Sequence, residues 1–266
     1  MKLLKSAALA TTLAFSLGLI STPANAICMG MACMYNSMTP LQAIMATELS
    51  VDEVMNLGVN SMGIVFIISI FMGMVITIQT ASNIDSELIP KYTVGFTARQ
   101  TIVLEFSPTI ISLILAGIVG SRISSELGSM RVTEQIDALE IMGVNSKNYL
   151  VLPKILGFMF ILPFIIIYSM VLGLFGGWVV GMASGIISSA DYIYGLQYWF
   201  EPFSIFYALI KTVLFAFIIA SVSSYYGYYV KGGSLEVGKA STKAVIWSSI
   251  AILFVNYLVT QLLLID

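Results

Sequence analysis

Long runs of apolar residues, separated by short polar segments, make up most of the sequence after about residue 58. A helix needs roughly 20 apolar residues to cross the hydrocarbon core of a bilayer. We therefore expect an all-α integral membrane protein, with an N-terminal segment at 1–57 and one membrane domain at 58–266. The five predicted transmembrane helices are residues 61–80, 100–121, 155–187, 203–226 and 244–264.

The third apolar stretch is long for a single perpendicular helix. Residues 155–190 carry no charge, and as a helix they would run about 54 Å against a hydrocarbon core of roughly 30 Å. Two spans here would move every later segment to the opposite side of the membrane, which the charge distribution below disfavours. We expect one long or bent helix, with Pro163 as a candidate bend point.

A polar segment, residues 121–154, lies between the second and third spans and carries eight of the 26 charged residues. Thr133 is expected to cap a short amphipathic helix, with Glu134 and Asp137 in its first turn. The apolar residues Ile136, Leu139 and Met142 recur at helical spacing. Gln135 and Glu140 are then expected to face water. A plain connector resting on lipid is the simplest interpretation, but it would need far fewer residues. A contact with a partner is the alternative.

Basic residues indicate the orientation, because Lys and Arg favour the cytoplasmic side of a membrane. Segment 121–154 and the loop 227–243 contain seven of them, whereas the loops 81–99 and 188–202 contain two. The first pair of segments is therefore expected inside. The membrane domain would then begin on the cytoplasmic side and end outside.

The N-terminus conflicts with this orientation. Residues 1–26 resemble a secretory signal, with Lys2 and Lys5 before an apolar run and Ala24-Asn25-Ala26 at its end. A cleaved or anchored signal would place residue 27 outside and invert every later segment. We give precedence to the charge distribution, so that this segment lies in the interface, re-enters the membrane or is atypical.

Composition excludes several classes of function. The chain is 58% hydrophobic and 10% charged, whereas a soluble domain carries about 25% charged residues. It has no histidine, which removes Ser–His triads and histidine-ligated metals. The net charge of −2 gives no sign of nucleic-acid binding. Cys28 and Cys33 are weak support for a metal or a disulfide, and we expect no metal site.

Residues 233–240, GSLEVGKA, nearly form a phosphate-binding loop. Ala240 replaces the Ser or Thr that would hold magnesium, and no hydrophobic strand precedes the segment. We interpret it as a flexible basic loop. The chain is therefore expected to be a non-enzyme that lacks an ATPase of its own and binds no cofactor.

Three polar residues in or beside the spans are candidates for function. Glu105 lies inside the second span, where a carboxylate costs about 2.5–3.5 kcal/mol. It would line a substrate chamber, act in a proton relay, or be an interfacial carboxylate near Arg99. Gln79 would line a pocket or bond across helices at the end of the first span. Lys211 is expected to extend toward the outer surface.

Four glycines in the third span repeat at intervals of four: Gly173, Gly177, Gly181 and Gly185. Small residues at this spacing let helix backbones approach closely in lipid. The pattern favours a tight helix contact, within the chain or across a dimer, over general glycine enrichment.

The polar segment carries a specific resemblance. Glu126-Leu127-Gly128, Met130-Arg131, Thr133-Glu134-Gln135 and Glu140-Ile141-Met142, continued by Gly176-Gly177 and KASTKA at 239–244, resemble the MlaE/YrbE permease family of lipid-transporting ABC systems. The resemblance covers about residues 58–266. It departs at Leu104 and Ile118, where the family often has Arg, and throughout 1–57.

The resemblance implies a homodimer of five-span subunits in the bacterial inner membrane, moving phospholipids between membranes to maintain outer-membrane asymmetry. It implies a separate cytoplasmic ATPase that uses ATP, an MCE-type substrate-binding protein on the outer side, and a small STAS-type regulatory subunit. The residues that would couple to the ATPase are Glu126, Met130, Arg131, Thr133, Glu134, Gln135, Glu140 and Met142. A lipid chamber between the subunits would be lined by Ile76, Gln79 and Glu105.

Two other classes stay open. A proton-coupled secondary transporter using Glu105 is the main alternative, although no inverted repeat is visible. A membrane enzyme is weaker, since no histidine, acidic pair or metal cluster is present at a matched spacing.

Overall fold

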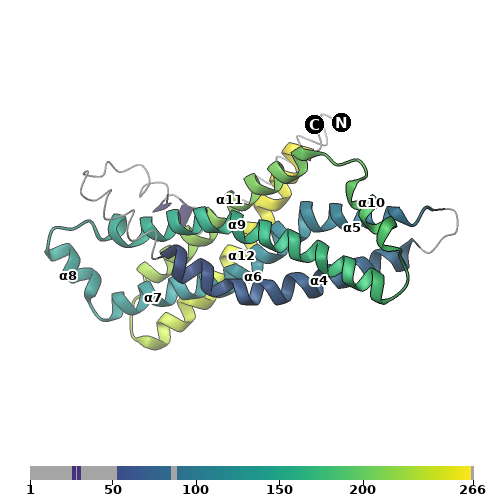
Figure 1. Ribbon diagram of the computed structural model, residues 1–266. Coiled ribbons are helices and arrows are strands. Elements are labelled where there is room, and N and C mark those ends of the chain that lie inside the picture. The colour runs from purple at the N-terminus through teal and green to yellow at the C-terminus, as the bar shows by residue number, and fades with distance from the viewer. Residues whose placement is uncertain (1–25, 28, 31–52, 85–88, 265–266) are drawn as a thin grey trace.

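The computed structural model describes residues 26–27, 29–30, 53–84 and 89–264. This part of the chain forms helices and no strand (Figure 1). The predicted all-α class and five membrane-crossing helices are confirmed: Val59–Asn83, Tyr92–Val132, Ser146–Ala183, Pro202–Tyr228 and Ser234–Leu262. The expectations for residues 1–25, Cys28 and Cys33 lie outside the described residues.

The first membrane helix, α4 (Met62–Asn83), begins after two short irregular turns, η1 (Val54–Gly58) and η2 (Val59–Ser61). The second is one continuous helix of 41 residues, about 60 Å long. Its parts are α5 (Tyr92–Thr101), η3 (Ile102–Ile110), α6 (Ile111–Leu115), η4 (Ala116–Gly120) and α7 (Ser121–Val132). The helix extends beyond the predicted span 100–121 at both ends. Hydropathy shows which residues lie in the bilayer, but it does not show where a helix begins and ends outside it.

An irregular part of this helix contains Glu105, the charged residue that lies inside the predicted second span. The segment η3 is a π-helix that contains Pro108 and Glu105. Proline has no N–H to donate and breaks the regular i→i−4 pattern. Single π-turns inside α-helices occur frequently at functional sites.

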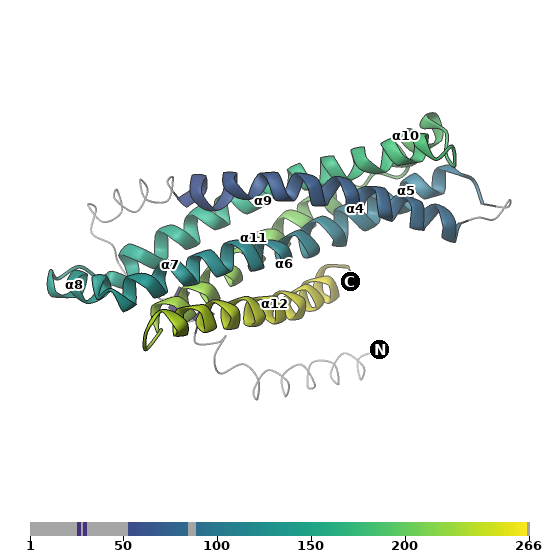
Figure 2. The same ribbon diagram turned by 90° about the horizontal axis from the view of Figure 1, so that it is seen from below.

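The third membrane helix, α9 (Ser146–Ala183), is a single helix of 38 residues that contains Pro153 and Pro163. The prediction of one long helix is confirmed, although α9 starts nine residues before the predicted 155. Between α7 and α9 lies α8 (Gln135–Ile141), at one end of the bundle. Helix α10 (Ser189–Gln197) lies beside α5 at the opposite end (Figures 1 and 2). We call these the α8 end and the α10 end.

Two segments expected to be loops are largely helical. Residues 188–202 contain α10, and the segment 227–243 contains the first turns of α12 (Ser234–Leu264). The nearly matching phosphate-binding pattern at 233–240 is therefore mostly helix and was wrongly interpreted as a flexible loop. The fourth membrane helix, α11 (Pro202–Tyr228), closely matches its predicted bounds.

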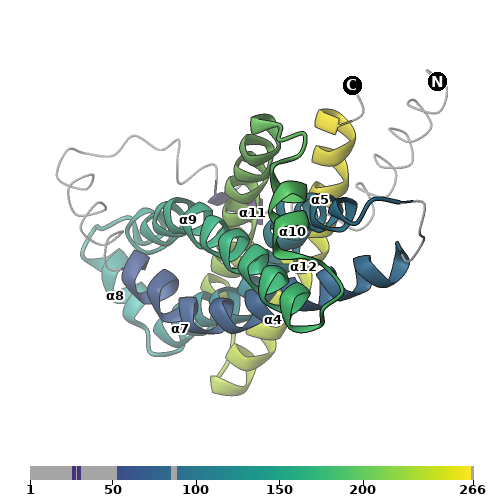
Figure 3. The same ribbon diagram turned by 45° about the vertical axis from the view of Figure 1, so that its right-hand side comes forward.

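Close backbone contact joins α4 to α9, which cross in Figure 3. Gly73 on α4 lies directly against the backbone of Gly173, and Gly176 against the backbone of Ile70. Gly177 faces Thr77 and Tyr192. The other two glycines of the repeat differ: Gly181 has no atom within 4 Å of a Cβ position, and Gly185 follows the end of α9 with a φ of +66°.

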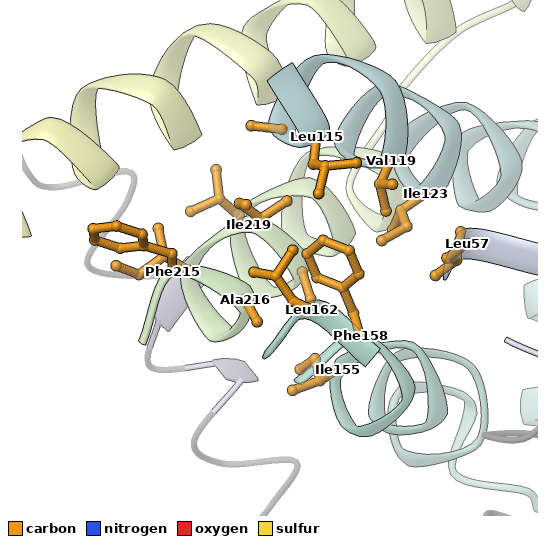
Figure 4. Close-up of a cluster of buried hydrophobic side chains, with 14 of the residues drawn as sticks. Leu57, Leu115, Val119, Ile123, Ile155, Phe158, Leu162, Phe215, Ala216 and Ile219 are labelled. Atoms are coloured by element: carbon orange, nitrogen blue, oxygen red, sulfur yellow. The ribbon is translucent and has the colours of Figure 1, made fainter. Parts of the chain in front are cut away.

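The main apolar core lies nearer the α8 end, where α6, η4, α7, α9 and α11 meet η1 (Figure 4). Side chains from each of these elements are at most 1% exposed: Leu57, Leu115, Val119, Ile123, Ile155, Phe158, Leu162, Phe215, Ala216 and Ile219. Hydroxyl groups add a polar link within the membrane helices, where Ser69 donates to Ser169 at 2.9 Å. The bundle is thus held by apolar packing, backbone contact and a few internal hydrogen bonds.

Replacing Gly176 by Ala tests the α4–α9 contact. The added methyl group would collide with the backbone carbonyl of Ile70, which cannot rotate away as a side chain can. We therefore expect the free energy of unfolding to fall by about 1–3 kcal/mol. Gly181→Ala on the same helix meets no atom within 4 Å and serves as the matched control. Thermal unfolding in detergent should show a lower midpoint for Gly176→Ala alone; equal midpoints would contradict the close contact.

Candidate functional site

An ion pair lies inside the membrane helices. Lys211 Nζ on α11 donates to Glu105 Oε1 on η3 at 2.9 Å. It also lies 3.4 Å from the carbonyl oxygen of Leu104 and 4.9 Å from the centre of the Tyr207 ring. The lysine side chain is completely buried. The prediction that Lys211 extends to the outer surface is therefore wrong, because the nearest stabilising charge for it is the Glu105 carboxylate.

The second carboxylate oxygen of Glu105 reaches α12. Asn256 Nδ2 donates to Oε2 at 3.2 Å. The Thr109 hydroxyl lies 3.3 Å from the same oxygen and 3.2 Å from Asn256 Oδ1. Glu105 thus connects η3, α11 and α12, yet 46% of its side chain stays exposed on the single chain.

The other two predicted chamber residues lie elsewhere. Ile76 is 8% exposed and packs in an apolar cluster with Ala98 and Ile102. Gln79 is exposed on α4. No contact described for these residues joins either one to Glu105, so the geometry of the single chain does not assemble the three into one cavity.

Arg99 does not neutralise Glu105. Its guanidinium donates to the carbonyl oxygens of Leu196, Tyr198 and Trp199 at 2.5, 3.1 and 3.1 Å. It also lies over the rings of Phe96 and Phe200 at 5.2 and 5.5 Å. Arg99 therefore satisfies the carbonyl end of α10 and fixes that helix on α5.

At the α8 end, Lys154 is held between two carboxylates. Its ammonium lies 2.5 Å from Glu53 Oε1 and 2.9 Å from Glu126 Oε2, with 3% of the side chain exposed. These contacts join η1, α7 and α9. Glu126, which the resemblance assigned to the ATPase contact, is thus part of an internal ion pair and 39% exposed.

Thr133 does not cap α8. Its hydroxyl donates back to the Ser129 carbonyl at 2.9 Å and so belongs to the end of α7. Glu134 precedes α8 in the left-handed region, with φ of 60° and no side-chain cap. Arg131 holds α8 from α7, with Nη1 2.6 Å from Asp137 Oδ1. Glu134, and not Thr133, therefore occupies the N-cap position of α8.

The carboxylate of Glu140 is held by hydrogen bonds within the chain. Its Oε1 accepts hydrogen bonds from Ser146 and Tyr228, each at 2.9 Å. These bonds lower the pKa of the Glu140 carboxyl below its usual range, the Ser146 bond having the largest effect. The carboxylate therefore stays charged at neutral pH and ties α8 to α9 and α11.

Other side chains face outward at α8. Ile141 is 86% exposed and Met142 68% exposed. Glu134 and Gln135 are also exposed, whereas Met130 packs against the main core. Of the predicted coupling residues, Thr133 and Glu140 are exposed but are held by the hydrogen bonds described above. The remaining outward group is Glu134, Gln135 and Met142, and Ile141 joins it.

Sequence comparison agrees with the resemblance drawn from the polar segment. The profile of the family described as Permease MlaE matches residues 50–262. The chain belongs to the MlaE permease family. A probable ABC transporter permease protein of Rickettsia bellii is 34% identical over 81% of this chain and 83% of its own length.

Two further relatives of this MlaE-family chain have more specific names. The intermembrane phospholipid transport system permease protein MlaE of Haemophilus influenzae is 26% identical, over 81% of this chain and 82% of its own length. Protein TRIGALACTOSYLDIACYLGLYCEROL 1, chloroplastic, of Arabidopsis thaliana is 30% identical, over 77% of this chain and 58% of its own length. The relatives' names favour the ABC permease over the proton-coupled alternative.

The partners of Glu105 and Lys154 were missed from the sequence. One signal was available: Glu105 and Lys211 are opposite charges in separate spans, and intramembrane charges commonly pair. The Lys154–Glu53 contact had no such signal, because both residues lie in the polar stretches outside the predicted spans.

Replacing Lys154 by Met tests the ion pair at the α8 end. Removal of the buried cation leaves the Glu53 and Glu126 carboxylates without their shared partner. We expect the free energy of unfolding to fall by about 3 kcal/mol. This is the low end for a broken buried ion pair, because Glu126 is partly exposed. Lys239→Met removes a lysine of an exposed pair and is the matched control. Unfolding midpoints in detergent that fall equally for both variants would contradict the account.

Proposed function

We propose that this MlaE-family chain is the membrane subunit of an ATP-driven phospholipid transporter of the bacterial inner membrane. It would act as a homodimer with a separate ATPase, an MCE-type protein and a STAS-type subunit, and would help to maintain outer-membrane asymmetry. The relatives named for permease and phospholipid transport support this assignment.

The observation that carries the lipid assignment is Glu105. A charged side chain facing hydrocarbon costs several kcal/mol, and the contacts of Glu105 with Lys211 and Asn256 offset that cost in part. Nearly half of the Glu105 side chain stays exposed on the single chain. A polar chamber between two copies, occupied by lipid headgroups, would satisfy this exposed part.

The α8 end is proposed to be cytoplasmic, because it gathers most of the basic residues between the helices. The exposed apolar pair Ile141 and Met142 gives α8 an outward surface for the ATPase. Its inward side is fixed to α7, α9 and α11 by Asp137 and Glu140. Movement of α8 would therefore be passed to three membrane helices.

Replacing Ile141 by Asp tests this contact. The side chain is 86% exposed, so the fold should be unaffected, but a buried carboxylate in the contact with the ATPase should reduce co-purification by 10-fold or more, roughly the effect of 1.4 kcal/mol or above. Leu235→Asp alters another apolar side chain, 76% exposed, at the start of α12.

The two variants should differ both in ATPase recovery and in ATP-driven lipid transport by reconstituted vesicles. Wild-type protein purified from its native membrane with no ATPase would argue against the proposed function as a whole. Equal recovery of the ATPase with Ile141→Asp and wild-type protein would remove α8 as the contact.

A further inference from the structure

A polar cavity of about 240 Å³ opens at the α8 end. It is formed where the end of α7, the end of α8, the start of α9 and the segment after α11 meet. Its lining includes Arg131, Glu140, Lys147, Tyr228, Tyr229 and Lys231. Glu105 and Arg131 lie 26 residues apart on one helix, or about 39 Å, so this cavity is separate from the ion pair with Lys211.

The cavity carries surplus positive charge. Three of its lining residues are basic and one, Glu140, is acidic. Arg131 is paired with Asp137. The charges of Arg131 and Lys147 also help to lower the pKa of the Glu140 carboxyl, after the hydrogen bonds from Ser146 and Tyr228. Among Arg131, Asp137, Glu140, Lys147 and Lys231, the cations therefore outnumber the anions by one, and Lys147 and Lys231 are the two lysines that line the cavity.

Aromatic rings give the same cavity the character of a membrane interface. Lys147 Nζ lies 5.7 Å from the centre of the Tyr228 ring and 5.8 Å from that of Tyr229. These two rings contact each other at 5.1 Å, and Tyr229 also contacts Tyr225 at 5.0 Å. Tyrosine is enriched where protein meets the headgroup layer, and basic pockets between membrane helices on the cytoplasmic side bind anionic headgroups.

We propose that this cavity binds the phosphate headgroup of an anionic phospholipid, as a site distinct from the transported lipid. Its volume is slightly below the roughly 300 Å³ of the smallest typical ligand pockets, which suits a headgroup whose acyl chains stay in the bilayer. The phosphate is held by Lys147 and Lys231, with the tyrosines beside its glycerol. Given the proposed function, the bound lipid braces α8 against α9 and α11 and tunes its response to the ATPase.

Lipid titration of the purified full chain, followed by native mass spectrometry, tests the site without any partner. The double variant Lys147→Gln/Lys231→Gln removes the surplus charge. Lys239→Gln/Lys243→Gln removes two exposed lysines from α12 at the same end, outside the cavity, and is the matched control. The probes are phosphatidylglycerol, phosphatidylcholine with the same acyl chains, and inorganic phosphate.

Phosphatidylglycerol should bind the first variant about 30-fold more weakly than wild type, since each lysine near an anionic headgroup contributes about 1 kcal/mol. The control should keep near wild-type affinity, and Lys147→Arg/Lys231→Arg should restore it. Phosphatidylcholine should bind wild type and variants alike.

Three results would overturn the proposal. Equal losses in both double variants would show general charge attraction and no site. Inorganic phosphate that binds as tightly as the lipid would identify a soluble anion as the ligand. Unchanged lipid binding by Lys147→Gln/Lys231→Gln, with loss of a co-purified ATPase, would make the cavity a docking point for an acidic protein side chain. Because the titration uses the isolated chain, failure to recover an ATPase from wild type would weaken the proposed function and leave this result standing.

Discussion

The arrangement of helices depends on the need to give polar partners to three buried cations in a molecule largely surrounded by lipid. Lys154, Lys211 and Arg99 are each at most 7% exposed as whole residues. A buried charge without a partner costs several kcal/mol, so each cation fixes the elements that supply its partners. Lys154 joins η1, α7 and α9; Lys211 joins α11 to η3; and Arg99 holds the end of α10 on α5.

These partners explain which features were predictable from the sequence. The five spans follow from the local length of apolar runs, so the crossing helices and the single long α9 were predicted. Lys211 was placed wrongly because its position depends on Glu105, 106 residues earlier. The helical parts outside the bilayer, among them α10 and the start of α12, were taken as loops because hydropathy carries no signal for a helix in water.

In the candidate site, too, the location of an element was predictable from the sequence, but the contacts of its side chains were not. The resemblance located α8 and Glu105 but could not separate inward from outward side chains. Glu126, Arg131, Thr133 and Glu140 make internal contacts, whereas Ile141, left out of the predicted set, is the most exposed apolar residue at α8. One continuous helix carries Glu105 at η3 and ends at the reversal before α8. The proposed lipid path and ATPase contact are thus linked by a single continuous helix.

The central claim is that Glu105 faces a chamber for transported lipid. A photo-crosslinking amino acid placed at position 105, in cells that contain the full transporter, tests it most directly; the same amino acid at position 112, where Ser112 is 0% exposed on the same helix, is the control. Mass spectrometry of the captured adducts should find phospholipid at position 105 and little at position 112. Absence of phospholipid at 105, or equal capture at both positions, would contradict the account.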